Sequence, residues 1–317
     1  MPLPEDSPAR ITLAVNPAAH AGLGDRRGRE AAAALRSRGV AVTELRRGSA
    51  SELAAAVAEA LPDSDAVVAV GGDGVVNLVA NVLAGTGVPL GVVPAGTGND
   101  VARLLGVPLD SVAGAVEALL AALEAGPRHL DLGRIEWPGG QRHYVAVASA
   151  GFDARVNERA NAWRWPRGRA RYVLAVLREL VSFRPILFEL AADGAAGSRR
   201  AMLVSVANGP SLGGGMLVAP AARADDGALD LLVVGPLSVP AFLEVFPKVF
   251  RGAHVGHPAV ELSTVRNVRL GAPGMVVYAD GERVAAGAVD ISVVPRALAV
   301  LAAPTADPAV RPGGRAG

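Results

Sequence analysis

Two strand-like runs of apolar residues in the first half of the chain each end in a glycine-rich turn. Ala66–Val70 leads into Gly71–Gly74, and Leu90–Val93 leads into Pro94–Asp100. Unbroken apolar strands separated by helices are typical of a parallel sheet that is covered on both faces. The carboxyl ends of parallel strands lie at one edge of such a sheet, where ligands bind. We therefore expect an α/β fold in which the two glycine-rich turns lie close together at one edge.

The same alternation extends from Arg10 to about Gly126. The apolar runs predict strands at Ile11–Asn16, Val40–Leu45, Ala66–Val70 and Pro89–Val93. The intervening segments predict helices at Asp25–Arg38, Ser51–Leu61, Val75–Leu83 and Asp110–Ala125. We expect Ser51 to cap the second of these helices, because a serine side chain can accept a hydrogen bond from a first-turn amide.

Beyond His129 the pattern changes to short segments rich in β-branched residues, which are separated by glycine-containing turns. These segments predict strands at Tyr144–Ser149, Leu187–Ala191, Met202–Ala207, Leu229–Val234, Val268–Leu270, Met275–Tyr278 and Val289–Val294. A helix is expected at Gly168–Ser182, and another is expected to open at Pro240. This texture favours an antiparallel sandwich or barrel.

The two textures predict two domains, and a chain of 317 residues is long enough for each to bury its own core. An α/β domain with a parallel sheet is expected over residues 1–127, and a β-rich sandwich domain over residues 128–295. The apolar run at 296–303 is a candidate to return to the first domain. Residues 304–317, rich in proline, glycine and alanine, are expected to be a disordered tail.

The composition excludes several classes of protein. Apolar residues make up 51% of the chain and charged residues 19%, which is too apolar for a disordered protein. The formal net charge is only +1, so no global field would attract nucleic acid. The absence of cysteine excludes disulfides and thiolate metal sites. The start of the chain is acidic rather than signal-like, and no apolar run reaches the roughly 18–20 residues of a membrane span, so we expect a cytoplasmic protein without a transmembrane segment.

Lysine is almost missing from this sequence, and that fact restricts how a phosphate can be bound. Of the 31 basic residues, only Lys248 is a lysine, and it lies in Phe-Pro-Lys-Val-Phe rather than in a glycine-rich loop. A P-loop of the G-x-x-x-x-G-K-[ST] kind is therefore impossible. If the protein binds a nucleotide, backbone amides and arginine must hold its phosphates.

The glycine-rich turns have the chemistry of a phosphate site. Glycine lets the backbone approach a ligand closely, and the start of the following helix presents unpaired amides to an anion. Asp73 would repel a bare phosphate but could hold a divalent cation that accompanies a nucleotide. A capped strand-to-helix turn is the ordinary alternative for one such motif. The second turn, with the hydroxyl of Thr97 and the amide of Asn99, favours the phosphate site.

At this point the sequence resembles the diacylglycerol kinase catalytic-domain superfamily, which includes bacterial soluble lipid kinases and the sphingosine and ceramide kinases. The resemblance is carried by an ordered series of motifs: Asn16-Pro17, Gly71-Gly72-Asp73-Gly74 with Asn77, Pro94-x-Gly96-Thr97-x-Asn99-Asp100, Ala150-Gly151-Phe152-Asp153, Asn208-Gly209 with Gly213-Gly214-Gly215, Asp225-Asp226-Gly227 and Asp280-Gly281-Glu282. It covers nearly the whole chain. It implies a diacylglycerol-kinase- and NAD-kinase-like α/β domain, a second β-rich domain, and ATP bound in the cleft between them.

The resemblance also implies roles for individual residues. ATP contacts are implied for one set of positions: Asn16, Gly71, Gly72, Asp73, Gly74, Val75, Val76, Asn77, Gly96, Thr97 and Asn99. Asp73 is expected to serve Mg²⁺-ATP chemistry, and Glu282 is expected to be the general base for the attacking lipid hydroxyl. A further structural Mg²⁺ is expected at the side chain of Asp226 and the backbone carbonyls of Arg223 and Ala228.

Two residues depart from the family pattern G-G-D-G-T-x-N-E. Val75 stands at the threonine position and cannot donate a hydroxyl hydrogen bond, and Leu78 stands where the family has a glutamate. These departures motivate one alternative function, a catalytically weak pseudokinase that binds nucleotide or lipid. An NAD kinase-like enzyme is a second alternative, because it shares the glycine-rich motif.

A basic and aromatic segment at 154–184 contains eight arginines and two glutamates, with Trp163, Trp165 and Tyr172 between them. Its composition suits a membrane interface, nucleic acid or a solvated helix face. A kinase that acts on bilayer lipids favours the membrane, so we expect a peripheral protein at the inner membrane surface that binds no nucleic acid. A homodimer is also expected.

Two smaller patterns are assigned ordinary structural roles. His254 and His257 are expected to be loop histidines, since Gly256 and Pro258 disfavour a helical metal site there. The phenylalanines at 242, 246 and 250 are expected to form a helix core rather than a lipid channel. Our overall prediction is an ATP-dependent lipid kinase that acts on diacylglycerol or a related lipid.

Overall fold

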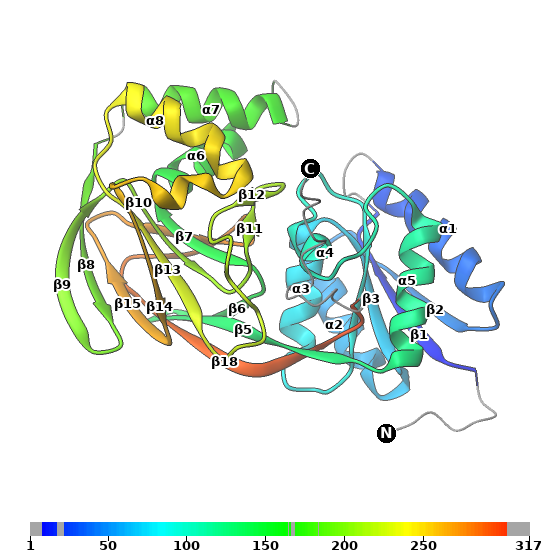
Figure 1. Cartoon of the computed structure of the whole chain (residues 1–317). Coiled ribbons are helices and arrows are strands. Elements are labelled where there is room, and N and C mark those ends of the chain that lie inside the picture. Colours follow the sequence, from blue (N-terminus) through cyan, green and yellow to red (C-terminus); the bar gives the residue numbers. More distant parts are fainter. Residues whose placement is uncertain (1–7, 18–21, 164, 166–168, 183, 303–317) are drawn as a thin grey trace, which may run out of the picture.

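The computed structural model describes residues 8–17, 22–163, 165, 169–182 and 184–302, so the expected tail at 304–317 lies outside the described residues. The chain forms two lobes, one built of helices around parallel strands and the other of packed sheets beneath a layer of helices (Figure 1). None of the helices within these ranges is both long and apolar enough to cross a membrane.

The first lobe contains four parallel strands in the order β2-β1-β3-β4. They are β1 (Arg10–Val15), β2 (Ala41–Arg46), β3 (Ala66–Gly71) and β4 (Leu90–Pro94). The helices are α1 (Leu23–Arg36), α2 (Ala50–Ala60), η2 (Leu61–Asp63), α3 (Asp73–Leu83), α4 (Asp100–Leu104) and α5 (Val112–Ala125). Helix α1 packs against α5, and α2 packs against α3. Every residue of β3 and β4 is buried, which explains their unbroken apolar sequence, and the expected α/β fold is confirmed.

Helix α2 begins earlier than the sequence suggested, because Ser49 caps it instead of Ser51. Ser49 has extended backbone angles, and its Oγ accepts a hydrogen bond from the amide of Glu52 at 3.2 Å. Ser51 already lies inside the helix, where its side chain cannot reach a first-turn amide. The spacing of Ser49 and Glu52 is that of a capping box, which is the signal that identifies the correct cap.

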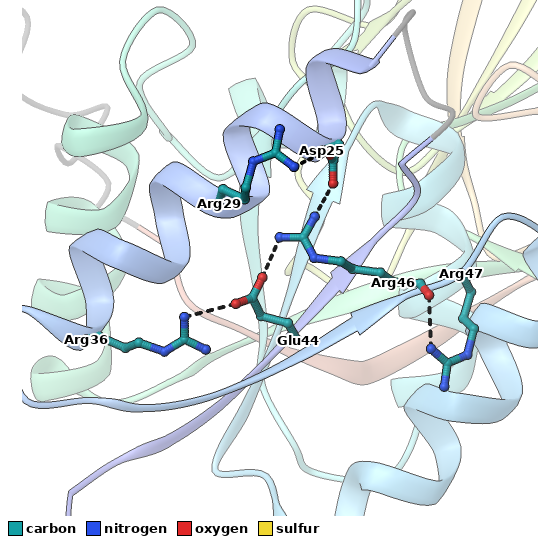
Figure 2. A network of polar contacts seen from close by, with 6 residues as sticks. All are labelled: Asp25, Arg29, Arg36, Glu44, Arg46 and Arg47. Carbon is teal, nitrogen blue, oxygen red and sulfur yellow. Dashed lines mark hydrogen bonds and ion pairs between the residues drawn. The ribbon is translucent and has the colours of Figure 1, made fainter.

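Much of the positive charge of the first lobe is neutralised locally. Figure 2 shows that Arg46, at the carboxyl end of β2, lies between the carboxylates of Asp25 and Glu44 and bonds to both. Arg29 bonds to Asp25, and Arg36 donates to Glu44 at 2.9 Å. These arginines join α1 to the edge strand β2, and the two carboxylates balance two of their three positive charges before any ligand binds.

The large sheet continues from the first lobe into the second. Its further strands are β5 (Arg128–Trp137), β6 (Gly140–Tyr144), β8 (Ile186–Ala192), β9 (Ala195–Ala201), β15 (Asn267–Gly271) and β18 (Val289–Val300). The order β4-β18-β15-β8-β9 follows the parallel strands, and β5 pairs with β18 and β6. Val300 pairs with Leu90 of β4, and the side chains of Leu298 and Leu301 lie in the first lobe's core. The strand β18 thus runs through both lobes, and the domain limits proposed from the sequence stay a prediction.

A second, antiparallel sheet lies against the extension of the first. Its order is β14-β13-β10-β7-β16-β17, made of β7 (Val147–Gly151), β10 (Leu203–Ala207), β13 (Leu229–Val234), β14 (Val260–Val265), β16 (Val276–Ala279) and β17 (Glu282–Ala286). The short pair β11 (Ser211–Leu212) and β12 (Met216–Leu217) stands apart. Side chains of both sheets share one core, which includes Tyr144, Phe188, Leu229 and Ile291. The expected β sandwich is confirmed.

Several elements of the second lobe were missed or misplaced. The segment predicted as one strand at Tyr144–Ser149 is divided, because β6 ends at Tyr144 and β7 begins at Val147. Helix α6 (Phe152–Ala162) was missed, since it starts directly after a strand without a capping side chain. Strand β9 was missed because its Ala, Gly, Ser and Arg residues lack β-branched character.

A layer of helices covers part of the second sheet (Figure 1). Besides α6, this layer contains α7 (Arg169–Ser182), α8 (Val239–Val245) and the short helices η3 (Phe246–Arg251) and η4 (Ala253–Gly256). On its inner face, Phe152 of α6 and Val176 of α7 form a small core with Met202. The sheet and the helices therefore enclose apolar space away from the parallel strands.

Candidate active site

The two glycine-rich turns touch each other at the carboxyl edge of the parallel strands. A Cβ atom on Gly72 would lie 3.1 Å from the Cα of Gly96, and one on Gly96 would lie 2.5 Å from the Cα of Gly72. Any side chain at either position would force the turns apart. The amide of Ala95 also donates to the carbonyl of Gly71 at 2.7 Å. Glycine is therefore required where the backbones meet.

Asp73 stands at the start of α3, facing the second turn. Its Oδ1 accepts a hydrogen bond from the amide of Val101 at 3.2 Å. A Cβ atom on Gly98 would collide with Oδ2 of Asp73 and would lie 3.4 Å from Oδ2 of Asp100. Burial, and secondarily the negative charge of Asp100, raises the pKa of Asp73 to about 6. Two carboxylates in this environment fit a divalent cation, which would relieve the unfavourable charge.

Asp100 connects this turn to the second lobe. Its buried carboxylate accepts hydrogen bonds from the amides of Gly214 and Gly215, both at 2.8 Å, and from Oγ of Ser211 at 3.2 Å. The glycine-rich segment at 213–215 is therefore held against the first lobe. Sequence analysis placed Asp100 in a motif but gave it no role, since its partners lie more than 100 residues further along the chain.

A buried carboxylate from the second lobe holds the other side of the site. Asp280 accepts hydrogen bonds from the amides of Val145, Ala146 and Val147, at 2.8, 2.9 and 3.2 Å. It also accepts one from Nδ2 of Asn77 in α3 at 2.8 Å. Burial raises the pKa of Asp280, although these donors favour its charged form. The contact joins the β16–β17 turn, the β6–β7 connection and α3.

Glu282 follows two residues after Asp280 and lies next to the glycine-rich turn. A Cβ atom on Gly74 would lie 2.8 Å from Oε1 of Glu282, so the carboxylate stands directly over the start of α3. Its side chain is exposed to the cleft. The structure thus brings together Asp73 and Glu282, the two residues to which the sequence assigned catalysis.

These residues line a cleft of about 500 Å³ between the lobes, a size typical of small-molecule sites. One wall is apolar and is formed by α2 and α3: Ala50, Leu53, Val75 and Leu78. The charged and polar side chains of the lining include Asp73, Thr97, Arg142, Asp280 and Glu282. Asn16 and Gly96 also reach the cleft.

Arg142 is a cleft residue that sequence analysis missed. Its Nε and Nη2 donate to Oδ1 of Asn77, at 3.1 and 2.7 Å, which fixes the guanidinium at the cleft wall. Among the residues that the structure describes, it is the one cation lining the cleft. The shortage of lysine did indicate that arginine must serve any phosphate. Nothing local marked Arg142, because it reaches the site only through contacts with α3.

The other predicted nucleotide residues have different surroundings. Val75 faces the cleft, whereas the side chain of Val76 lies in the first lobe's core, which leaves only its backbone for a ligand. Asn77 is committed to Asp280, Arg142 and the carbonyl of His143. Asn99 closes its own turn through two hydrogen bonds with the backbone of Gly96, both at 2.9 Å. These two asparagines therefore shape the cleft rather than reach into it.

The proposed structural metal site lies elsewhere, in the loop before β13. Oδ1 of Asp226 accepts the amide of Ala228 at 3.1 Å, and Arg223 pairs with Asp225 at 3.2 Å. One carboxylate and two carbonyl oxygens are the hard ligands that Mg²⁺ prefers, with waters completing its shell. The described residues hold no cluster of three or more histidine or acidic side chains that would bind a metal by themselves. These residues therefore fit a metal ion whose ligands are mostly backbone carbonyl oxygens and water molecules.

The raised pKa of Asp73 predicts a pH-dependent effect of Asp73→Asn. The folded protein binds this proton more tightly than the unfolded chain, so stability falls as pH rises from about 4 to about 6, and the loss persists above pH 6. Without metal, we expect Asp73→Asn to raise the free energy of unfolding at pH 8 by about 1–3 kcal/mol, and by much less at pH 4. Urea denaturation measures both values.

Asp63→Asn is the matched control for this prediction, since the Asp63 side chain is 90% exposed. It should change stability little at either pH. An Asp73→Asn variant that is no more stable than the natural protein at pH 8 would contradict the burial argument.

Comparison with known proteins agrees with this geometry. Residues 10–135 match the family described as Diacylglycerol kinase catalytic domain. Residues 146–302 match the YegS C-terminal NAD kinase beta sandwich-like domain. A protein of Mycobacterium tuberculosis named diacylglycerol kinase is 41% identical over 298 residues, covering 92% of this chain and 94% of that protein. Another of that name from Bacillus subtilis is 30% identical, covering 72% and 74%.

The fold is also shared with a solved structure. A diacylglycerol kinase from Bacillus anthracis strain Sterne superposes with a TM-score of 0.67 at 20% sequence identity, covering 96% of this chain and 98% of that one. At such identity the likeness supports the fold. The sequence matches, which extend over both lobes, support more: the chain belongs to the diacylglycerol kinase catalytic-domain family of lipid kinases.

Proposed function

We propose that this protein transfers the γ-phosphate of Mg²⁺-ATP to the free hydroxyl of diacylglycerol or a closely related glycerolipid. The observation that carries the proposal is the position of Glu282 over the turn that contains Gly74 and Asp73. A base and a phosphate-binding turn that line the same cleft are the arrangement that phosphoryl transfer to an alcohol requires.

The cleft walls suggest how ATP would lie. The apolar wall at Ala50, Leu53 and Leu78 suits the adenine ring, and the start of α3 offers amides to the phosphates. Arg142 would add the positive charge that a P-loop lysine supplies elsewhere. Mg²⁺ would be held by Asp73 and would neutralise charge on the transferred group. Catalysis then depends mainly on positioning and charge, as is general for this reaction.

Glu282 would accept the proton of the lipid hydroxyl as the oxygen attacks. The new bond joins that oxygen to the γ-phosphorus, and the bond from this phosphorus to the β–γ bridging oxygen breaks, so ADP leaves. The phosphorylated lipid carries the transferred group, and the proton remains on Glu282 until solvent takes it. A positioned base of this kind typically contributes about 10²–10⁴-fold.

An apolar cavity in the second lobe supports a lipid substrate. It lies between the second sheet and the helical layer, has a volume of about 100 Å³, and is lined in part by Phe242 and Phe246. These rings pack with Phe152 in the core of the helical layer, as the sequence analysis expected, and they also line this cavity. In the second sheet, Ala148 of β7 pairs with Ala279 of β16, and Ala279 pairs with Glu282 of β17. Ser149, the residue after Ala148, donates a hydrogen bond to Asp153. Two strand spacings, roughly 10 Å, therefore separate the base from β7, where Ser149 bonds to Asp153 of the cavity wall.

The outer face of the helical layer supports docking to a membrane surface. Trp165 is 82% exposed, and Leu174 and Leu177 of α7 are each 44% exposed. Leu243 and Phe250 are exposed on the neighbouring α8 and η3, and Arg178 is exposed on α7. Exposed apolar side chains beside cations suit an anionic bilayer. This face covers the apolar cavity, so docking there would bring bilayer lipid close to that cavity.

We therefore propose a cytoplasmic protein that acts at the inner membrane surface. The second Mg²⁺, at Asp226 with the carbonyls of Arg223 and Ala228, would stabilise the loop before β13. A homodimer stays a prediction of the sequence.

Transfer of labelled γ-phosphate tests the proposed function directly. The purified protein is given Mg²⁺-ATP with diacylglycerol, monoacylglycerol, sphingosine or ceramide in mixed micelles, and with NAD in parallel. Labelled diacylglycerol supports the proposal, whereas labelled NADP would establish the NAD kinase alternative. ATP binding without any product would favour the pseudokinase, and Val75→Thr with Leu78→Glu would then be expected to restore transfer.

Glu282→Gln should lower kcat by about 10²-fold or more while leaving the affinity for ATP nearly unchanged, because only the proton acceptor is lost. Steady-state transfer and calorimetric ATP binding measure the two effects. Glu261→Gln, an exposed change on β14, is the matched control. Unchanged kcat in Glu282→Gln would assign the base to another group.

Arg142→Gln should weaken ATP binding by about 10–100-fold, the range expected for loss of a charged hydrogen bond, and weaken AMP binding far less. Calorimetry with both nucleotides separates phosphate recognition from base recognition. Arg283→Gln is the control, since Arg283 neighbours Glu282 but pairs with Glu158 on α6. Equal losses for ATP and AMP would mean that Arg142 only supports the fold around Asn77.

Changing Leu174 and Leu177 together to serine should lower transfer on anionic vesicles by about 10-fold, because less apolar area enters the bilayer. Transfer to a short-chain diacylglycerol in solution should stay the same. A double change of the exposed Leu187 and Leu262, which lie on β8 and β14, is the control. An unchanged rate on vesicles would place the docking face elsewhere.

A further inference from the structure

One residue of the apolar cavity's wall has a buried polar atom without a hydrogen-bond partner. His254, in η4, is only 3% exposed and lines the cavity. Its Nε2 lies 3.1 Å from the carbonyl oxygen of Val218. Because a carbonyl can only accept, Nε2 must carry the hydrogen. The other ring nitrogen, Nδ1, is buried and has no hydrogen-bond partner.

The surroundings of His254 make Nδ1 an acceptor. Burial lowers the pKa of the ring, so the neutral form prevails at physiological pH, and its single hydrogen is on Nε2. Nδ1 is then an unpaired acceptor on a residue of the cavity wall. An unpaired buried acceptor costs free energy in the free protein, which a suitable ligand would recover.

The acidic residue of the wall does not compete for this role. Asp153 also lines the cavity, but Oδ2 of its carboxylate accepts hydrogen bonds from Ser149 at 2.7 Å and from Asn157 at 3.2 Å. Val218, whose carbonyl accepts from His254, packs with Leu232 and Val260. A buried water needs two to four polar partners, so Nδ1 alone would not hold one.

The order of the second sheet separates His254 from the reacting end of the substrate. Val218 packs against Leu232 of β13 and Val260 of β14, whereas Glu282 lies on β17 at the opposite edge. Five strand spacings lie between β14 and β17, which amounts to roughly 20–25 Å. The group that Nδ1 meets is therefore far from the hydroxyl that would be phosphorylated.

We propose that His254 selects a lipid whose hydrocarbon chain carries a hydroxyl group, which donates a hydrogen bond to Nδ1 inside the cavity. This inference rests on the proposed function, because it names a feature of the lipid that this kinase would bind. The chain hydroxyl is a recognition group and is not the phosphoryl acceptor. An unsubstituted chain can enter the same cavity but leaves Nδ1 unpaired.

Matched pairs of diacylglycerols test the proposal. One member of each pair has plain stearoyl or palmitoyl chains, and the other carries a single hydroxyl, in 12-hydroxystearoyl or 16-hydroxypalmitoyl form. For the natural protein we expect kcat/KM to be about 5-fold higher for at least one hydroxylated member, as one additional hydrogen bond would give.

His254→Gln is the informative variant, because its amide can still donate to Val218 while no acceptor remains at the place of Nδ1. It should bind ATP normally and phosphorylate plain and hydroxylated lipids at similar kcat/KM. His257→Gln is the matched control: His257 accepts the amide of Ala259 at 3.1 Å and lies outside the cavity wall. This control should keep the preference of the natural protein.

The outcomes separate this inference from the proposed function. Phosphorylation of both lipids without any preference in the natural protein would overturn the role of His254 and leave the kinase intact. Failure to phosphorylate any lipid would overturn the proposed function. Calorimetric binding of 12-hydroxystearate against stearate would then decide the inference by itself: tighter binding that His254→Gln abolishes supports it, and equal binding overturns it.

Discussion

The buried carboxylate of Asp280 is the contact on which the rest of the site depends. It sits at a positive φ of 47° in the β16–β17 turn and accepts three successive backbone amides of the second lobe. Its fourth donor is Asn77 of α3, in the first lobe. Glu282 follows two residues later, so the same interaction that joins the lobes also sets the position of the base over Gly74. The Asp280 contact therefore affects both the stability of the fold and the position of the proposed base.

Helix α3 combines three tasks within its first two turns. Its start presents the glycine-rich turn and Asp73 to the cleft, and Asn77, one turn later, bonds to both Asp280 and Arg142. The phosphate-binding turn, the cleft cation and the base are therefore linked through a single asparagine side chain. A relative movement of the lobes would displace Arg142 and Glu282 together, because both belong to the second lobe and reach α3 through this residue.

Local patterns in the sequence predicted what local physics determines. Buried parallel strands, glycine at close backbone contacts and Asp73 in its turn follow from short motifs, whereas Glu282 was implied by the family resemblance. The roles of Arg142, Asp280 and Asp100 did not, because each depends on partners between 65 and 203 residues away. Helix α6 and strand β9 were missed for the opposite reason: their own sequences carry weak signals, and packing against the sandwich decides their conformation.

The two departures from the family pattern are consistent with an active cleft. Leu78 extends the apolar wall that Ala50 and Leu53 begin, which suits a planar base. A glutamate at that place would add a charge to a cleft that already contains Asp73, Asp280 and Glu282, with Arg142 as the cation that lines it among the described residues. Negative charges at short range disfavour the binding of an anionic nucleotide. Leucine at position 78 avoids this additional repulsion, which Arg142 would otherwise have to offset. Val75 loses a hydroxyl, but the amides of the turn remain, and they carry the positive end of the helix.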